Sequence, residues 1–196
     1  MHKNNEFIYY KVFSAFENVV AFTSTKQSFK AQNPRFTGDS PEIFVNNREL
    51  LAAKLMIKPE QLIFPRQTHT NCVAEILDIP ADEIKETDAL VTNKTGICLC
   101  VQTADCVPIL LFDPMNNVIA AVHAGWRGTV KKIVEIAVQK MALKYNSLPE
   151  NIVAAIGPSI SPDIYEVGKE VVEEVKKSIP NADILLHKNK IGRAHV

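Results

Sequence analysis

Residues 102–128, QTADCVPILLFDPMNNVIAAVHAGWRG, hold the pattern from which the rest of the chain is best understood. Two apolar runs of strand length, Val107–Phe112 and Val118–Val122, flank turn-forming residues and predict a hairpin or another tight connection. Cys106 immediately precedes the first run, and His123 immediately follows the second. The hairpin therefore places a thiol and an imidazole at the same end of neighbouring strands. Such a pair suits a transition metal or a nucleophile with its base.

Apolar patterns elsewhere predict short strands and a few helices. Because no helix-length pattern interrupts residues 62–122, this region favours an antiparallel or mixed sheet over a doubly wound one. The expected fold class is α/β (α+β), with helices covering a large mixed sheet. Strands are expected at Ile8–Phe13, Val19–Thr23, Leu62–Phe64, Val73–Ile76, Asp88–Val91, Ile97–Val101 and Ile152–Ile156, with a loop over Thr25–Asp39. Helices are expected from Asp39 to about Met56, at Pro59, from Gly128 to Tyr145 and over Val167–Ser178.

The composition is that of an ordinary globular domain. A length of 196 residues favours a single domain with a real core. Lys plus Arg and Asp plus Glu each number 22, so no net field favours nucleic acid or an acidic membrane as a partner. The N-terminus lacks an apolar leader, and no apolar run approaches the ~18 residues of a membrane span. We therefore expect a cytoplasmic protein with reduced cysteines.

His69, Cys106 and His123 are the candidate metal ligands. A lone cysteine at a strand start is usually a small buried hydrophobe, and a histidine after a buried strand is often structural. These three, however, all lie at strand ends of the same sheet-rich region. Two imidazoles and one thiolate match the ligand set of a catalytic zinc, which keeps its fourth position open for water.

The segment after His123 suits an anion. Gly125 and Gly128 bracket Trp126 and Arg127 just before the predicted helix. Glycine permits close approach of a ligand to the backbone, and the guanidinium of Arg127 can hold phosphate or carboxylate. The structural alternative is a glycine-rich turn with a packed tryptophan.

Several longer motifs resemble the YfiH family, whose members are also called laccase-domain or multicopper polyphenol oxidase proteins and purine nucleoside phosphorylases of that type. The resemblance runs from about residue 19 to residue 175. It implies a layered α/β/β/α fold in a single domain over residues 1–196 that lacks the family's C-terminal segment. The motifs are FTGDSPEIFVNNRELLA (36–52), QTHT (67–70), TDALVTNKTGICLCVQTADCVP (87–108), HAGWRG (123–128) and AAIGPSISPDIYEVG (154–168).

The resemblance also implies a metal, usually zinc, on the histidine of Q-x-H, the cysteine of ADC and the histidine of HAGWRG. These map onto His69, Cys106 and His123. Two positions depart from the family pattern. Thr70 replaces a glycine after the Q-x-H histidine, and an Arg-Gly-Gly loop is replaced at residues 25–28, where Lys26 keeps a cation for the substrate.

The activities that the resemblance implies are phosphorolysis of adenosine, inosine, guanosine and methylthioadenosine, and deamination of adenosine. An older description is copper-dependent oxidation of phenols, and some members are linked to peptidoglycan precursor editing. Laccase chemistry needs several copper centres and many histidines, whereas this chain has five. Of the activities that the resemblance implies, the residues therefore favour the one on a purine nucleoside and phosphate in a zinc enzyme, with copper as the alternative metal.

Individual roles can be assigned within that hypothesis. Asp105 is expected to move protons or to orient His123 while the metal activates water for deamination. Arg127 and the backbone at Gly125–Gly128 are expected to hold phosphate. Two rival hypotheses remain: a metal that only staples the fold, although a structural zinc normally has four protein ligands, and a cysteine hydrolase with Cys106 as nucleophile and His123 as base.

Overall fold

The computed structural model describes residues 6–29, 34–38, 41–182, 186–187 and 193–194. The strands are β1 (Phe7–Tyr9), β2 (Phe22–Ser24), β3 (Leu62–Ile63), β4 (Val73–Glu75), β5 (Ala89–Thr92), β6 (Cys98–Leu99), β7 (Val107–Asp113), β8 (Val118–Ala124), β9 (Val153–Ile156), β10 (Leu186–His187) and β11 (Arg193–Ala194). The α-helices are α1 (Pro41–Leu55), α2 (Trp126–Val130), α3 (Ile133–Tyr145) and α4 (Lys169–Ser178). Short 3-10 helices are η1 (Lys11–Phe13), η2 (Lys26–Ser28), η3 (Pro59–Gln61) and η4 (Pro149–Asn151).

The main sheet has five strands in the order β4-β5-β8-β7-β9. Its middle is the predicted hairpin, in which β7 and β8 pair antiparallel from Val107 opposite Ala124 to Asp113 opposite Val118. The buried carboxylate of Asp113 closes the turn by accepting the backbone N–H of Met115 at 2.9 Å. Because β4 and β5 run parallel while the other pairs are antiparallel, the sheet is mixed, as predicted.

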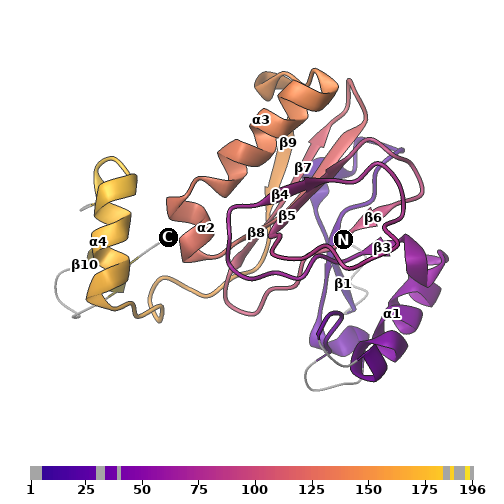
Figure 1. Ribbon diagram of the computed structural model, residues 1–196, viewed down its shortest axis with the longest axis horizontal. Helices are drawn as coiled ribbons and strands as arrows, with labels where there is room; N and C mark the ends of the chain where they lie inside the picture. Colours follow the sequence, from indigo (N-terminus) through magenta and orange to yellow (C-terminus); the bar gives the residue numbers. More distant parts are fainter. Residues whose placement is uncertain (1–5, 30–33, 39–40, 183–185, 188–192, 195–196) are drawn as a thin grey trace.

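Helices cover both sides of this strand-rich centre (Figure 1). On one face, α3 buries Ile133 and Met141 in the cluster that contains Val91 of β5 and Val122 of β8. Each such fully buried side chain contributes roughly 1.5–3 kcal/mol. On the other face, Ile63 of β3 packs in one cluster with strand residues of the main sheet, and α1 lies beyond the β3–β6 pair. The resulting order of layers, α/β/β/α, confirms the fold class expected from the family resemblance.

The predicted helix over Gly128–Tyr145 is wrong in one respect, because it is two helices. Lys132 has φ 61° and ψ 41°, a left-handed conformation that ends α2 before α3 begins. The apolar period runs through this break, since Val130 and Ile133 are both buried, and so the pattern gave no sign of it. The break lets α2 leave the sheet and pack in one cluster with Val171 and Val175 of α4.

The predicted N-terminal strands are also only partly correct. Strand β1 ends at Tyr9, and the segment predicted as its second half is the helix η1. The turn brings Phe13 into a buried cluster with Phe112 and Ala155 of the main sheet, which an uninterrupted strand does not allow. Strand β6 is shorter than predicted, the predicted loop after β2 contains η2, and the predicted cap at Asp39 lies outside the described residues.

Among the described residues, no helix combines the length and the apolar character that crossing a membrane requires.

Candidate metal centre

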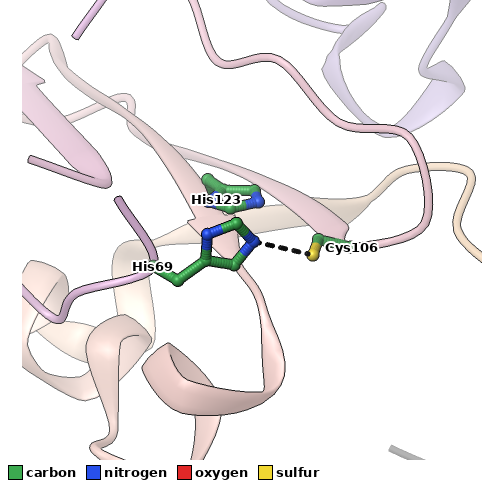
Figure 2. A group of neighbouring side chains, drawn as sticks. All are labelled: His69, Cys106 and His123. Carbon is green, nitrogen blue, oxygen red and sulfur yellow. Dashed lines mark hydrogen bonds between the residues drawn. The ribbon is translucent and has the colours of Figure 1, made fainter. Parts of the chain in front are cut away.

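The three predicted ligands meet at one end of the hairpin (Figure 2). The ligand atoms of His69, Cys106 and His123 all lie within 4.8 Å of one another, and Cys106 Sγ is 3.8 Å from His69 Nε2. His123 belongs to β8, Cys106 immediately precedes β7, and His69 comes from the loop between β3 and β4. The pairing of β7 with β8 thus brings Cys106 and His123 together, and His69 comes from a loop distant in sequence.

This donor set fits a metal ion. Zinc bonds of about 2.0–2.1 Å to nitrogen and 2.3 Å to sulfur place two tetrahedral ligands roughly 3.6 Å apart. The observed 3.8 Å between Cys106 Sγ and His69 Nε2 needs only a small adjustment. His123 is buried, Cys106 is half-buried and His69 is exposed, so one side of the cluster faces solvent. Imidazole and thiolate donors suit zinc and copper alike.

Asp88 holds two of the three ligands in place. Its buried carboxylate lies 2.7 Å from His123 Nδ1 and accepts the backbone N–H groups of Thr68 at 3.2 Å, His69 at 3.1 Å and Thr70 at 2.7 Å. His69 has φ 60°, a left-handed conformation that these consecutive hydrogen bonds stabilise. Because Nδ1 of His123 is engaged by Asp88, its Nε2 is the nitrogen left to bind a metal.

The charges follow from these contacts. Burial disfavours the charged form of Asp88, but hydrogen bonds from His123, Thr70 and Thr68 lower its pKa to about 2. Burial also opposes the charging of His123, yet the hydrogen bonds with Asp88 and Cys106 raise its pKa to about 9. Burial, followed by repulsion from His123, lowers the pKa of His69. Without metal, Asp88 and His123 therefore form a buried ion pair, and a bound cation replaces the His123 proton.

The acid in contact with His123 is thus Asp88 rather than the predicted Asp105. Asp105 is exposed, and it lines a pocket beside Cys106. The sequence pattern predicts Asp88 only as the first residue of the strand over Asp88–Val91, and it does not indicate a role in the site. The available signal was a carboxylate at the start of a fully buried strand, where an acid requires partners.

Gly125 is a point of close approach, as the sequence predicts. A Cβ atom there lies 2.9 Å from His69 Cδ2 and 3.2 Å from Cys106 Sγ. Gly128 is also tightly packed, but against the carbonyl of Thr70 at 3.1 Å and against Ile133. Both glycines therefore allow close packing around the cluster, and of the two Gly125 is the one that lies against candidate ligands, His69 and Cys106.

The cluster borders a small pocket that is open to solvent. The exposed Arg127 stacks over the Trp126 ring at 4.4 Å, beside the pocket. Lys26, on η2, is not among the lining residues. These are Asp105, Cys106, Val107, Ala124, Gly125, Trp126, Ser159, Ile160, Pro162 and Tyr165.

Replacing Gly125 with alanine should weaken metal binding about tenfold, because the new methyl group displaces the ring of His69 and the sulfur of Cys106 by a few tenths of an ångström. Competition titration with a metal indicator measures the affinity. Cys72→Ser is the control, since its exposed thiol lies outside the cluster of His69, Cys106 and His123. Equal metal affinities for Gly125→Ala and the unmodified protein contradict this assignment.

Comparison with known proteins identifies a family and several relatives that this chain resembles. A sequence model of the family described as "Multi-copper polyphenol oxidoreductase laccase" matches residues 22–196. A purine nucleoside phosphorylase of Bacteroides thetaiotaomicron is 35% identical over 99% of this chain and 78% of its own length. Adenosine deaminase RL5, from an unknown prokaryotic organism, is 39% identical over 92% of this chain and 74% of its own length.

Solved structures agree with the sequence comparisons. The crystal structure of YlmD from Geobacillus stearothermophilus superposes with a TM-score of 0.82 at 28% identity and covers 93% of this chain and 74% of that one. The hypothetical protein YfiH of Bacillus licheniformis gives a TM-score of 0.81 at 27% identity, over 90% of this chain and 72% of that one. The chain is thus similar in fold to proteins longer than itself.

Proposed function

The chain belongs to the family described as multi-copper polyphenol oxidoreductase laccase, and on that premise we propose that it is a metal-dependent purine nucleoside phosphorylase that also deaminates adenosine. The observation that carries the proposal is the convergence of His69, Cys106 and His123 beside a pocket. The names of two similar proteins, a purine nucleoside phosphorylase and an adenosine deaminase, support the choice of substrate.

His69, Cys106 and His123 would hold the metal, with zinc the proposed ion. A metal held by three protein ligands supplies a Lewis acid that polarises oxygen and lowers the pKa of water. Asp88 fixes the orientation of His123 through Nδ1 and anchors the His69 loop through three backbone N–H groups. The protein's own contribution is a rigid set of donors that opens to solvent on the side of His69.

The pocket beside Cys106 is proposed to bind the nucleoside. Trp126 and Tyr165 line it and offer aromatic surface against which a purine ring can pack. Arg127, exposed and stacked on Trp126, is the proposed phosphate contact, because a guanidinium can bind two phosphate oxygens at once. Gly125 also lines the pocket and is the proposed backbone contact beside it. Methylthioadenosine, a nucleoside with the same base, belongs to the same proposed substrate class.

Proton transfer during deamination is assigned to Asp105. Its side chain is exposed and lines the pocket next to Cys106, where a carboxylate can accept a proton from water and return it to the base. Asp88 is excluded from this role, because its carboxylate is buried and already accepts hydrogen bonds from the His69 loop.

Copper-dependent oxidation of phenols is the less favoured alternative. Over the residues that the structure describes, His69, Cys106 and His123 form the one group of three or more His, Cys, Asp or Glu side chains suited to a metal. Multicopper oxidation requires several such centres with many more histidines. The cluster of His69, Cys106 and His123 therefore supports chemistry at the one ion that it can hold.

The test is an assay of adenosine with and without phosphate, using protein loaded with zinc and protein stripped by a chelator. The expected products are adenine and ribose 1-phosphate when phosphate is present, and inosine when it is absent. Stripping should abolish both, and adding zinc back should restore them. If zinc-loaded protein converts neither adenosine, inosine, guanosine nor methylthioadenosine, the proposed function is wrong.

A further inference from the structure

A second pair of sulfur atoms lies outside the centre described above. Cys98, in β6, and Cys100, just after it, place their Sγ atoms 3.7 Å apart. Both side chains are half-buried and neither is in a disulfide. The backbone N–H of Cys100 donates to the carbonyl of Ile63 at 2.9 Å, which extends the pairing with β3. Because alternate residues of an extended chain share one side, the two thiols point the same way.

The distance between the sulfurs suits a bridging ion better than a disulfide. A thiolate–metal bond of about 2.3 Å, as for zinc, allows one ion to touch two sulfurs up to roughly 4.6 Å apart. The two thiols share a hydrogen bond at 3.7 Å, which is within that reach, and the sulfurs must move apart toward its limit to hold a two-coordinate ion between them. A disulfide bond, at about 2.05 Å, requires the sulfurs to approach much further.

The surroundings favour a cation of charge +1. The pair packs against an apolar cluster that includes Leu62 and Phe64, where net charge is costly. The hydrogen bond with Cys98 and burial raise the pKa of the Cys100 thiol, and the positive charge of Arg48, whose guanidinium lies 5.1 Å from the centre of the Phe64 ring, opposes this rise. Two thiolates with a monovalent ion carry one negative charge, which Arg48 neutralises. A divalent ion leaves the site with an uncompensated positive charge.

We propose that Cys98 and Cys100 form a second metal site, separate from the His69–Cys106–His123 centre, for a soft monovalent cation of the Cu(I) class. Thiolates are the ligands that Cu(I) prefers. When one monovalent cation replaces the two thiol protons, the charge of the two-cysteine site falls from zero to minus one. The positive charge of Arg48 offsets this negative charge. This site does not depend on the proposed nucleoside activity, and its test needs no turnover.

The test is an anaerobic titration with Cu(I) against a competing chelator. The unmodified protein should bind about two ions per chain, and the Cys98→Ser/Cys100→Ser variant about one, held by the remaining imidazole and thiolate centre. Cys72→Ser is the matched control, because Cys72 is exposed and no other cysteine is paired with it among the described contacts. It should still bind two. Circular dichroism of each variant checks that it is folded.

X-ray absorption of the unmodified protein loaded with two Cu(I) ions provides an answer that does not require any variant. The measurement averages the two ions, so sulfur neighbours should outnumber nitrogen neighbours per copper, because Cys98, Cys100 and Cys106 supply sulfur while only His69 and His123 supply nitrogen. The proposal is overturned if the unmodified protein binds a single ion, if the Cys98→Ser/Cys100→Ser variant keeps two, or if Cys72→Ser loses one. It is equally overturned if nitrogen neighbours outnumber sulfur neighbours in the averaged shell.

Discussion

Replacing Cys106 with serine should remove the metal and reduce nucleoside turnover at least about a thousandfold, because a Lewis acid contributes several kcal/mol to the transition state and about 1.4 kcal/mol corresponds to a factor of ten. Cys106 is the only thiolate in the cluster of three ligands, and its sulfur lies 3.8 Å from His69 Nε2. A neutral serine hydroxyl is a poor ligand for zinc. Metal analysis of the purified variant, together with the adenosine assay, measures both losses.

A second substitution separates a metal ligand from a nucleophile. Cys106→Asp keeps an anionic donor that binds zinc, so it should recover metal and part of the turnover that Cys106→Ser loses. If Cys106 were instead the nucleophile of a hydrolase, with His123 as its base, the two variants would be equally inactive and a chelator would leave the unmodified protein active. Cys72→Ser, at an exposed thiol, should change neither metal content nor turnover. Full metal content in Cys106→Ser contradicts the assignment.

The parts of the fold that could be predicted are those set by local sequence. The β7–β8 hairpin follows from two apolar runs around one turn, and its register then fixes where Cys106 and His123 lie. The partners on either side, β5 along β8 and β9 along β7, could not be predicted. Such pairings join segments far apart in the chain, and apolar alternation is the same for any partner strand.

Residues with a left-handed backbone are a second feature of the fold that could not be predicted from the sequence. Lys132 and His69 both have φ near 60°, and neither is a glycine or an asparagine that would indicate a left-handed turn. At Lys132 the break lets α2 pack against α4, and at His69 the conformation is held by hydrogen bonds to Asp88. In both cases tertiary contacts decide the backbone, so no local pattern could reveal it.

The alignment of the His69 loop with the Cys106 segment shows the same dependence on distant contacts. The side-chain amide of Gln67 accepts the backbone N–H of Gln102 at 2.7 Å and donates to its carbonyl at 2.8 Å. Gln67 therefore acts as a strand partner two residues before His69 and joins it to the segment that leads to Cys106. The sequence indicated which residues could bind a metal, but the distance between them is set by side chains whose partners only the fold reveals.

Asp88→Asn should lower metal affinity and turnover about a hundredfold, the upper end of what losing a hydrogen-bonding partner of metal ligands usually costs. The carboxylate accepts from three consecutive backbone N–H groups and pairs with His123 Nδ1 at 2.7 Å. An amide has one acceptor oxygen, and its NH₂ group would face donors, so the His69 loop and the His123 ring would both lose their fixed positions.

Thermal unfolding with and without zinc, together with competition titration, measures the effect. Zinc stabilises the unmodified protein in proportion to the logarithm of its affinity, and this shift should shrink in the variant. Asp78→Asn is the matched control, because among the described contacts the exposed Asp78 accepts only the backbone N–H of Ile79, at 2.8 Å, outside the cluster. If Asp88→Asn keeps the zinc-dependent shift in full, Asp88 does not position the ligands.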